Sequence, residues 1–271
     1  MDLLWKAAVQ GLVEGIAEFL PVSSTSHLLI LSDLLNMGQG DFVKLFGTVI
    51  QLVSILAVVI YFRKILIPLE MIRDRAVRQR TFELWGKIIV GIIPILLIGA
   101  VAAKLGWVDI MLTRPLIMVG ALFIGGLLLL RIENWCRHDD PVTELSGISY
   151  KTAFLIGLIQ CLAIVPGTSR SAATIIGAIA LGLARPLAAE FSFLLAIPVM
   201  AAASAYSLLK HHSAMTSEEW LALAVGSAVT FLVSMFAVSW LMRFIKTHTF
   251  EIFGWYRMAL AVAVAAYLFL K

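Results

Sequence analysis

Long runs of apolar residues dominate this chain of 271 residues. A helix that crosses a bilayer needs about 20 mostly apolar residues. Runs that approach this length occupy residues 42–62, 84–103, 115–131, 187–209, 219–242 and 252–270. The pattern predicts an all-α polytopic membrane protein with six transmembrane helices.

Two further apolar regions, residues 7–35 and 150–184, are each interrupted by a proline and a hydroxyl-rich run. Proline ends or kinks a helix because it lacks an amide N–H and clashes with the preceding turn. The breaks at Pro21 and Pro166 leave halves of about 14 residues, or about 21 Å of helix against a hydrocarbon core of about 30 Å. Because neither half can cross alone, we predict two re-entrant helical hairpins whose tips are enclosed by protein or water.

The two broken regions also resemble each other in sequence. GLVEGIAEFLPVSSTSHLLI aligns with GLIQCLAIVPGTSRSAATII, which pairs Pro21 with Pro166 at an offset of 145 residues. This similarity indicates an internal duplication within a single membrane domain, with repeat 1 at about 1–133 and repeat 2 at about 150–271. A hairpin followed by three spans makes an odd number of crossings, so the second copy is expected to be inverted.

Charged residues are few, and their positions predict the orientation of the chain. The sequence is 61% hydrophobic and 14% charged, which is far too apolar for a soluble domain, and the net charge of +4 does not suggest binding to nucleic acid. Residues 63–87 form the most basic loop, which is therefore predicted to be cytoplasmic. This loop carries Arg63, Lys64, Arg73, Arg75, Arg78, Arg80 and Lys87.

Following the chain from that loop assigns a side to every other segment. The cytoplasmic side then also holds residues 131–151, Arg185 and residues 243–251, while both termini lie on the outer side of the membrane. The first hairpin then opens to the outside and the second to the cytoplasm. We expect the two tips to meet near the midplane of the membrane.

The first broken region carries groups that are costly inside a membrane. Glu14 and Glu18 are four residues apart, so they share one face of a helix. Pro21 then ends that helix just before residues 23–27, with the sequence SSTSH. Ionisable residues at membrane depth usually line a bundle interior or a wet cavity, so this segment is the first candidate for a functional site.

Both carboxylates and the residues after the break suggest chemistry on a phosphate. Glu14 and Glu18 would repel an anion unless one is protonated or a divalent cation, Mg²⁺ or Ca²⁺, lies between them and the phosphate oxygens. Ser24 and His27 are three residues apart on the following helix. This spacing would place a hydroxyl beside an imidazole, as nucleophilic catalysis requires.

At the second tip a helix is expected to begin after Pro166-Gly167, capped by Thr168 or Ser169. Helix starts expose unpaired N–H groups and a partial positive charge, and Arg170 adds a full charge with fork geometry suited to phosphate. Two converging starts therefore predict an anion site. The candidate substrate-binding residues are Ser23, Thr25, Gly167, Thr168, Ser169, Ser171 and Thr174.

Some of these residues have a plainer interpretation. The hydroxyls of Ser23, Thr25 and Ser171 can satisfy backbone groups that the proline breaks expose, and for these three that role is favoured. Gln51 and Gln160 are equally open to a place in the site or to a role in bridging helices. Glu190 and Arg257 are expected near span ends, where long side chains snorkel to the interface.

Two other classes of protein fit part of the pattern. Inverted repeats with broken helices also describe secondary transporters, so a lipid-phosphate flippase or an ion-coupled carrier is the main alternative. A carrier needs anion ligands but no activated nucleophile, and Ser24 with His27 argues for an enzyme. An intramembrane serine protease is a weaker alternative, because Arg170 with paired glutamates suits phosphate better than a peptide carbonyl.

Two motifs in these regions resemble those of a known family. EGIAEFLPVSSTSH and PGTSRSAAT are similar to the glutamate-rich and PGxSRSxxT motifs of bacterial undecaprenyl pyrophosphate phosphatases of the bacitracin-resistance type. The similarity covers essentially the whole chain. It implies a multi-pass hydrolase of the bacterial cytoplasmic (inner) membrane, with a site open to the periplasm, that removes one phosphate from the C55 lipid carrier diphosphate for peptidoglycan synthesis. It also implies dependence on a divalent metal and raised tolerance of bacitracin.

The resemblance also implies roles for individual residues. The motif glutamates of the family fall on Glu14 and Glu18, its histidine on His27, its adjacent serine on Ser24 and its arginine on Arg170. We predict that Ser24 attacks the terminal phosphorus with His27 as base. His27 as nucleophile and a metal-bound water directed by Glu18 stay open as alternatives. The expected partners are a polyprenyl diphosphate and membrane lipid, and a homodimer is possible.

Two positions depart from the usual family pattern. Ser26 and Ala172 stand where glycine is common, and both are small. Glycine permits backbone angles that serine and alanine avoid, so local geometry is in question there. Every reactive group of the motifs is nevertheless present.

Overall fold

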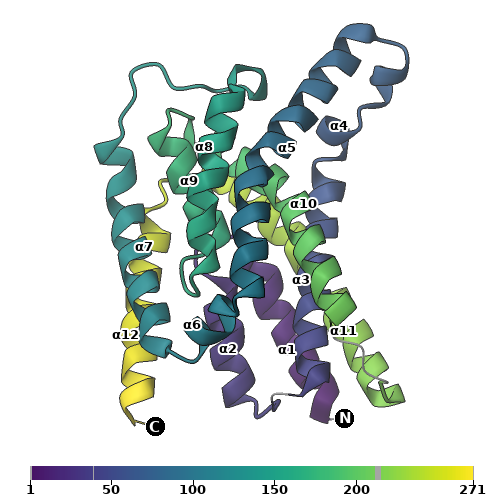
Figure 1. Ribbon diagram of the computed structural model, residues 1–271, viewed down its shortest axis with the longest axis vertical. Helices are drawn as coiled ribbons and strands as arrows, with labels where there is room; N and C mark the ends of the chain where they lie inside the picture. Colours follow the sequence, from purple (N-terminus) through teal and green to yellow (C-terminus); the bar gives the residue numbers. More distant parts are fainter. Residues whose placement is uncertain (1, 39, 211–214, 271) are drawn as a thin grey trace.

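The computed structural model of the protein describes residues 2–38, 40–210 and 215–270, all of them in helices and the loops that join them (Figure 1). Six helices are long and apolar enough to cross a membrane. This number and their positions confirm the six spans that hydropathy predicts. The six are α3 (Asp41–Tyr61), α5 (Arg75–Lys104), α7 (Pro115–Trp135), α10 (Arg185–Lys210), α11 (Ser217–Phe244) and α12 (Glu251–Leu270).

The two broken regions form shorter helices, as predicted. The first gives α1 (Asp2–Ala17) and α2 (Ser24–Leu34), while the second gives α8 (Tyr150–Gln160) and α9 (Arg170–Ala180), with the short helix η3 (Cys161–Ile164) after α8. Helices of 16 and 11 residues are about 24 and 17 Å long, which is less than the thickness of a hydrocarbon core. Figure 1 shows α1 and α2 in the lower half of the molecule, near both termini, and α8 and α9 in the upper half.

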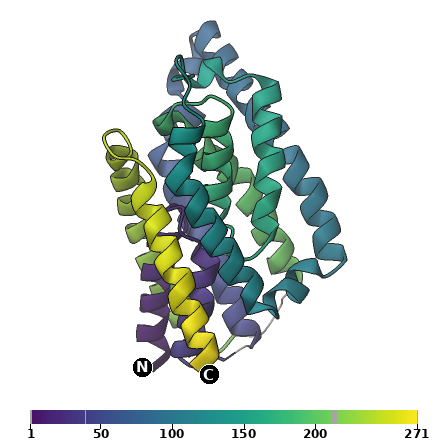
Figure 2. The ribbon, with the colours of Figure 1, turned by 90° about the vertical axis from the view of Figure 1, so that its left-hand side faces the viewer.

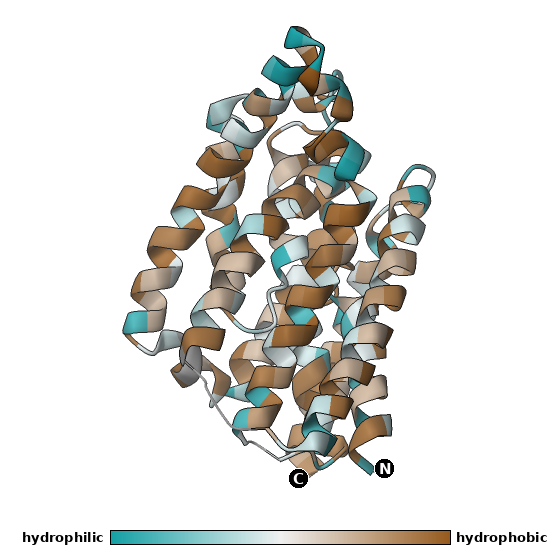
Figure 3. Cartoon of the chain, turned by 90° about the vertical axis from the view of Figure 1, so that its right-hand side faces the viewer, coloured by the Kyte–Doolittle hydropathy of each residue, from teal (hydrophilic) through white to brown (hydrophobic). Residues whose placement is uncertain are grey.

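Four short elements connect the longer helices. These are α4 (Arg63–Leu66), η1 (Leu69–Ile72), α6 (Trp107–Leu112) and η2 (Leu145–Gly147). The predicted basic loop therefore contains two short helices and the first turns of α5, which begins at Arg75 instead of at residue 84. Asp74 caps α5 by accepting a hydrogen bond from the amide of Ala76 at 2.7 Å. Figures 2 and 3 show this region projecting beyond the bundle, with hydrophilic residues gathered at its end.

Close contacts between helix backbones hold the short helices in place. A Cβ added at Gly11 of α1 would lie 2.5 Å from the carbonyl oxygen of Gly226 in α11. A Cβ added at Gly157 of α8 would lie 1.7 Å from the carbonyl oxygen of Gly91 in α5. Helices α1 and α8 thus pack directly on the main chain of a spanning helix, which only glycine permits.

The prediction that Arg257 snorkels to the interface is wrong. Its side chain is fully buried, between α12, α7 and the loops that follow α1 and η3. Sequence position suggested a span end, but four backbone carbonyls inside the bundle satisfy the guanidinium instead. Glu190 is half-buried in α10.

Candidate functional site

The loops after α1 and η3 end in two serines with unusual backbone angles. Ser23 and Ser169 have φ values of +73° and +70°, and each directly precedes the first residue of a helix, α2 or α9. A positive φ is unfavourable for residues other than glycine, and such strain is characteristic of functional sites. The side chain of Ser169 caps α9 by accepting from the amide of Ala172, whereas Ser23 makes no side-chain cap.

Glu18 joins the two loops. Its Oε2 accepts a hydrogen bond of 2.6 Å from the hydroxyl of Ser24, and its Oε1 lies 3.1 Å from Nη2 of Arg170. Glu18 is buried, and the ion pair with Arg170 connects residues 152 positions apart in the sequence. The first residue of α2 and the first residue of α9 therefore meet on one carboxylate, as expected for converging helix starts.

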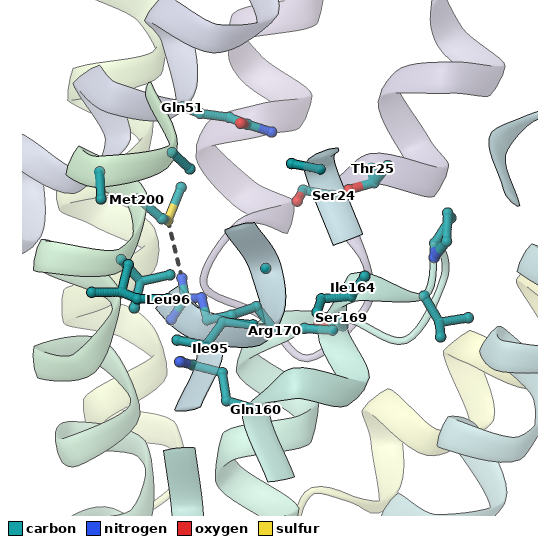
Figure 4. Close-up of a pocket in the computed structure, with 18 of the residues that line it drawn as sticks. Ser24, Thr25, Gln51, Ile95, Leu96, Gln160, Ile164, Ser169, Arg170 and Met200 are labelled. Carbon is teal, nitrogen blue, oxygen red and sulfur yellow. Dashed lines mark hydrogen bonds between the residues drawn. The ribbon is translucent and has the colours of Figure 1, made fainter. Parts of the chain in front are cut away.

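A cavity of about 700 Å³ lies beside this cluster (Figure 4). Glu18, Ser24 and Arg170 form a polar end, together with the amides of Gln51 and Gln160. The walls come from α5 and α10 and are mainly apolar: Ile95, Leu96, Gly99, Ala103, Val199, Met200, Ala203 and Tyr206. The arrangement can hold an anionic group at one end and an apolar chain along its walls.

The cavity reaches the side of the molecule. Leu96 on α5 is 40% exposed and Tyr206 on α10 is 54% exposed, although both line the cavity. Both helices are candidate membrane spans. A ligand bound between α5 and α10 would therefore be accessible from the side of the bundle, where the outer surface of the spans lies, as well as from its ends.

In the part of the chain that the structure describes, two buried side chains near the cluster, Glu14 and Gln160, have polar atoms that no hydrogen-bond donor or acceptor satisfies. Neither carboxylate oxygen of Glu14 has a donor among the described residues, but the carboxyl group lies against that of Glu18, close enough for the two to share a proton, and within electrostatic reach of Arg170. The amide of Gln160 is likewise unpaired although it is fully buried and lines the cavity. Unsatisfied buried groups are costly unless a proton, an ion or a ligand compensates them. The two glutamates could hold a divalent cation with additional oxygens from a bound phosphate or water.

The other predicted substrate-binding residues divide into two groups. Ser23, Thr25, Gly167 and Ser169 line the cavity. Thr168, Ser171 and Thr174 lie outside its lining, and the last two bind protein groups. Ser171 donates to the carbonyl of Leu20 at 3.0 Å, and the hydroxyl of Thr174 lies 2.5 Å from that of Ser192. The hydroxyl of Ser171 therefore links α9 to the loop after α1 and satisfies a backbone carbonyl there, which is the structural role favoured for it.

His27 faces away from Ser24. Its Nδ1 lies 2.8 Å from the carbonyl oxygen of Ser23, and its Nε2 lies 2.6 Å from the hydroxyl of Tyr256 on α12, with the two rings nearly parallel. A carbonyl can only accept, so we assign the ring proton to Nδ1. Among the hydrogen bonds of the described residues, none joins Ser24 to His27. The structure therefore brings Ser24, Glu18 and Arg170 together, and it places His27 beside them with a different partner.

Two residues next to the site were not found by sequence reasoning. Tyr256 touches His27, and Arg257 donates hydrogen bonds to the carbonyls of Pro21 and Gly167. The signal available in the sequence was a tyrosine and an arginine together inside an apolar span. Met200 also contacts the cluster, since its sulfur lies 3.5 Å from Nη2 of Arg170, as Figure 4 shows.

Comparison with known proteins identifies the family of this chain. Residues 7–263 match the family described as bacitracin resistance protein BacA. The chain is 41% identical over 270 residues to the undecaprenyl-diphosphatase of Lacticaseibacillus paracasei, covering 98% of both chains. It is 42% identical over 269 residues to undecaprenyl-diphosphatase 1 of Clostridioides difficile, covering 98% of this chain and 97% of the relative. It is 40% identical over 264 residues to the undecaprenyl-diphosphatase of Aquifex aeolicus, covering 97% and 98%. The protein, a multi-pass membrane protein, therefore belongs to the bacitracin resistance protein BacA family.

Proposed function

We propose that this protein is an undecaprenyl-diphosphatase that hydrolyses undecaprenyl diphosphate to undecaprenyl phosphate and inorganic phosphate. The observation that carries the proposal is the meeting of Ser24, Glu18 and Arg170 at the polar end of a cavity with apolar walls. The full-length relatives bear the name of this activity. The product would return to peptidoglycan synthesis as a lipid carrier, and its recycling would raise tolerance of bacitracin.

The shape of the cavity suits a lipid diphosphate. Arg170 and the amide groups at the start of α9 would bind phosphate oxygens, because a guanidinium and a helix start both favour an anion. Gln160 supplies an unpaired amide in the same wall. The isoprenoid nearest the diphosphate would lie along the apolar residues of α5 and α10. The diphosphate would thereby contact polar and charged groups, and the isoprenoid would contact apolar side chains.

Within this proposal Ser24 is the nucleophile. Its oxygen forms a bond to the terminal phosphorus while its proton passes to Glu18, whose carboxylate already accepts that hydrogen bond. The bond between the terminal phosphorus and the bridging oxygen breaks, and undecaprenyl phosphate leaves with the electron pair. Water then attacks the phosphoserine, releasing inorganic phosphate and restoring the serine hydroxyl. Arg170 stabilises the charge that develops on the phosphoryl oxygens.

Two other mechanisms are compatible with the same residues, and they differ from this one in the group that attacks the phosphorus. In the structure Nε2 of His27 is occupied by Tyr256, so the proposal gives the first proton transfer to Glu18. His27 as the nucleophile, or Glu18 directing a water, would give different intermediates. Trapping the enzyme with a radiolabelled terminal phosphate tests this, since an acid-stable phosphoserine at Ser24 is expected. An acid-labile adduct on His27 would contradict it.

A divalent cation, Mg²⁺ or Ca²⁺, is part of the proposal. The unpaired, buried carboxylate of Glu14 beside Glu18 fits such a cation, because hard cations prefer carboxylate and phosphate oxygens. Glu14 and Glu18 would hold it, and when bound it would neutralise charge on the diphosphate. Among the described residues, no group of three or more His, Cys, Asp or Glu side chains is arranged so that it could hold a metal ion. Phosphate and water oxygens would therefore complete its coordination.

We further propose that α1–α2 and α8–α9 are re-entrant hairpins of two inverted repeats, about 1–133 and 150–271, in a single membrane domain. Their lengths support this, since none of the four helices equals the thickness of the hydrocarbon core. The packing between the two repeats supports the proposal too. Helix α1 of the first repeat packs on α11 of the second, and α8 of the second packs on α5 of the first. In this orientation the cavity extends toward Lys104 and the periplasmic side.

Phosphate release from purified protein tests the function. In detergent with Mg²⁺, the parent protein is expected to release phosphate from undecaprenyl diphosphate. Ser24→Ala is expected to lose at least ~100-fold of the rate, because the reaction would lose its nucleophile. Ser239→Ala on α11 is the matched control, with an unchanged rate. A parent that releases no phosphate would favour the alternative of a lipid-phosphate flippase or ion-coupled transporter.

The oligomeric state is a separate prediction. Glu18 contacts both Ser24 and Arg170 within one chain. A homodimer stays a prediction from the sequence. The mass of the detergent-solubilised protein, measured by light scattering after chromatography, would decide between one copy and two.

A further inference from the structure

The guanidinium of Arg257 lies where the two loops meet, and the proposed reaction leaves it without a role. The side chain is 0% exposed although it carries a charge. Nη1 donates to the carbonyl of Pro21 at 3.1 Å, and Nη2 donates to the carbonyl of Gly167 at 2.9 Å. Each carbonyl belongs to a residue two positions before a strained serine, Ser23 or Ser169. One side chain is therefore bonded to the main chain of both loops at equivalent places.

The remaining donors fix the same guanidinium to α7. Nε donates to the carbonyl of Leu122 at 3.3 Å, and Nη2 also donates to that of Ala121 at 3.0 Å. In the described part of the chain, the ion pairs of the structure do not include Arg257. A buried charge without a counter-ion is costly, so the four carbonyl dipoles are its compensation.

Helix α7 also provides the space for this side chain. A Cβ added at Gly125 would lie 2.2 Å from Nη2 of Arg257. A Cβ added at Gly120, one and a half turns earlier in α7, would meet no atom within 4 Å. Glycine at position 125 is therefore required by the guanidinium, whereas glycine at position 120 is not required by any described neighbour.

We propose that Arg257 is a positioning residue of the diphosphatase, which sets the distance between the two helix starts. The inference rests on the proposed function. Pro21 lies between Glu18 and Ser24, and Gly167 lies three residues before Arg170, so a shift of either loop changes the Glu18–Arg170 contact. A displacement of about 1 Å in an active site can cost about 100-fold in rate.

Arg257→Lys in the purified full-length protein is the first test. Lysine keeps the charge, but its single ammonium group cannot reach all four carbonyl oxygens that the planar guanidinium contacts. With undecaprenyl diphosphate as substrate, kcat per folded molecule is expected to fall about 10- to 100-fold while KM changes less than about threefold. The folded amount is measured by chromatography and by thermal unfolding of the same sample.

Two matched pairs separate positioning from loss of stability. Lys87 is a second buried cation that donates to loop carbonyls, those of Leu145 and Ser146, and it also pairs with Glu83; none of these residues belongs to the two loops of the site. Lys87→Met is expected to lower the unfolding temperature and to leave kcat per folded molecule unchanged. Gly125→Ala is expected to lower kcat by pressing on the guanidinium, and Gly120→Ala is expected to leave it unchanged.

Several results would overturn the inference. A kcat for Arg257→Lys within about twofold of the parent would show that catalysis does not need the hydrogen bonds of the guanidinium to both loops. Rate losses in the Arg257 and Gly125 variants that only follow the loss of folded protein, as in Lys87→Met, would reduce Arg257 to a stabilising residue. A parent protein without phosphatase activity would instead overturn the proposed function, and the inference with it.

Discussion

At the scale of single residues, Glu18 is the side chain on which most contacts of the site depend. It accepts from Ser24 with one oxygen and pairs with Arg170 through the other. Hydrogen bonds to an ionised acceptor are stronger than those between neutral groups. Loss of its charge would therefore release both partners at once, and it would also remove the proposed proton acceptor.

Glu18→Gln is expected to lower kcat for phosphate release by about 100-fold or more, the range associated with general base catalysis. The amide keeps the shape of the side chain but does not take the serine proton. Glu144→Gln, in the loop before η2, is the control, because its carboxylate accepts a hydrogen bond from the neighbouring Ser146 and does not line the cavity described for the site. Retention of more than about a third of the parent kcat by Glu18→Gln would exclude Glu18 as the base.

Tyr256→Phe tests the contact between α12 and His27. The change removes the hydroxyl that lies 2.6 Å from Nε2 and keeps the ring that stacks on the imidazole. We expect kcat to fall about 3- to 30-fold, because a hydrogen bond of about 1–2 kcal/mol holds the imidazole, whose Nδ1 in turn donates to the carbonyl of Ser23, the residue directly before the proposed nucleophile. Tyr61→Phe at the end of α3 should have no effect. Equal rates in the two variants would show that His27 does not need this partner.

At the scale of elements, the short helices depend on contacts between backbones. Gly11 of α1 and Gly157 of α8 each approach the main chain of a spanning helix. Such contacts fix a short helix that has too few residues to cross the membrane and too little surface to hold itself in place. Gly11 and Gly157 therefore help to fix α1 and α8, the helices that lead into the two loops of the site.

Gly157→Ala is expected to destabilise the protein by about 1–3 kcal/mol or more, the cost of overpacking. The added methyl would overlap the carbonyl oxygen of Gly91. Gly47→Ala in α3, where an added Cβ meets nothing within 4 Å, is the control and should be neutral. Thermal unfolding in detergent measures both. Equal unfolding temperatures would mean that α8 can shift away from α5 at little cost.

At the scale of the whole molecule, the sequence allowed prediction of the elements better than of their contacts. The six spans follow from hydropathy, and the breaks follow from Pro21 and Pro166, because both are local properties. The proposed repeat and its parity predicted that the two loops meet, and the contact between Glu18 and Arg170 confirms the meeting. The partner of His27 could not be predicted, since Tyr256 is 229 residues away and no periodic pattern links the two.

The same limit explains the error at Arg257. Charge near the end of an apolar run usually indicates snorkelling, and only the fold reveals four carbonyls at one point inside the bundle. Ser24 and His27 illustrate a related limit. Helical spacing places both on neighbouring turns, but it does not determine that Ser24 turns to Glu18 while His27 turns to α12.

Gly99→Phe tests whether substrate occupies the cavity between α5 and α10. The new ring would fill space beside Gly99, where an added Cβ meets nothing within 4 Å, and would obstruct the apolar walls. We expect kcat/KM for undecaprenyl diphosphate to fall at least about tenfold, because the isoprenoid would lose its contact surface. Gly120→Phe on α7 is the control. An unchanged kcat/KM in Gly99→Phe would place the isoprenoid elsewhere.

The opening between α5 and α10 has a kinetic consequence for the proposed enzyme. If the polyprenyl tail stays among the surrounding acyl chains during turnover, the enzyme meets its substrate by diffusion in two dimensions. The relevant concentration is then the mole fraction of carrier in the bilayer. Added phosphatidylcholine should slow initial hydrolysis in proteoliposomes, even when the amounts of carrier and enzyme per volume of suspension stay constant.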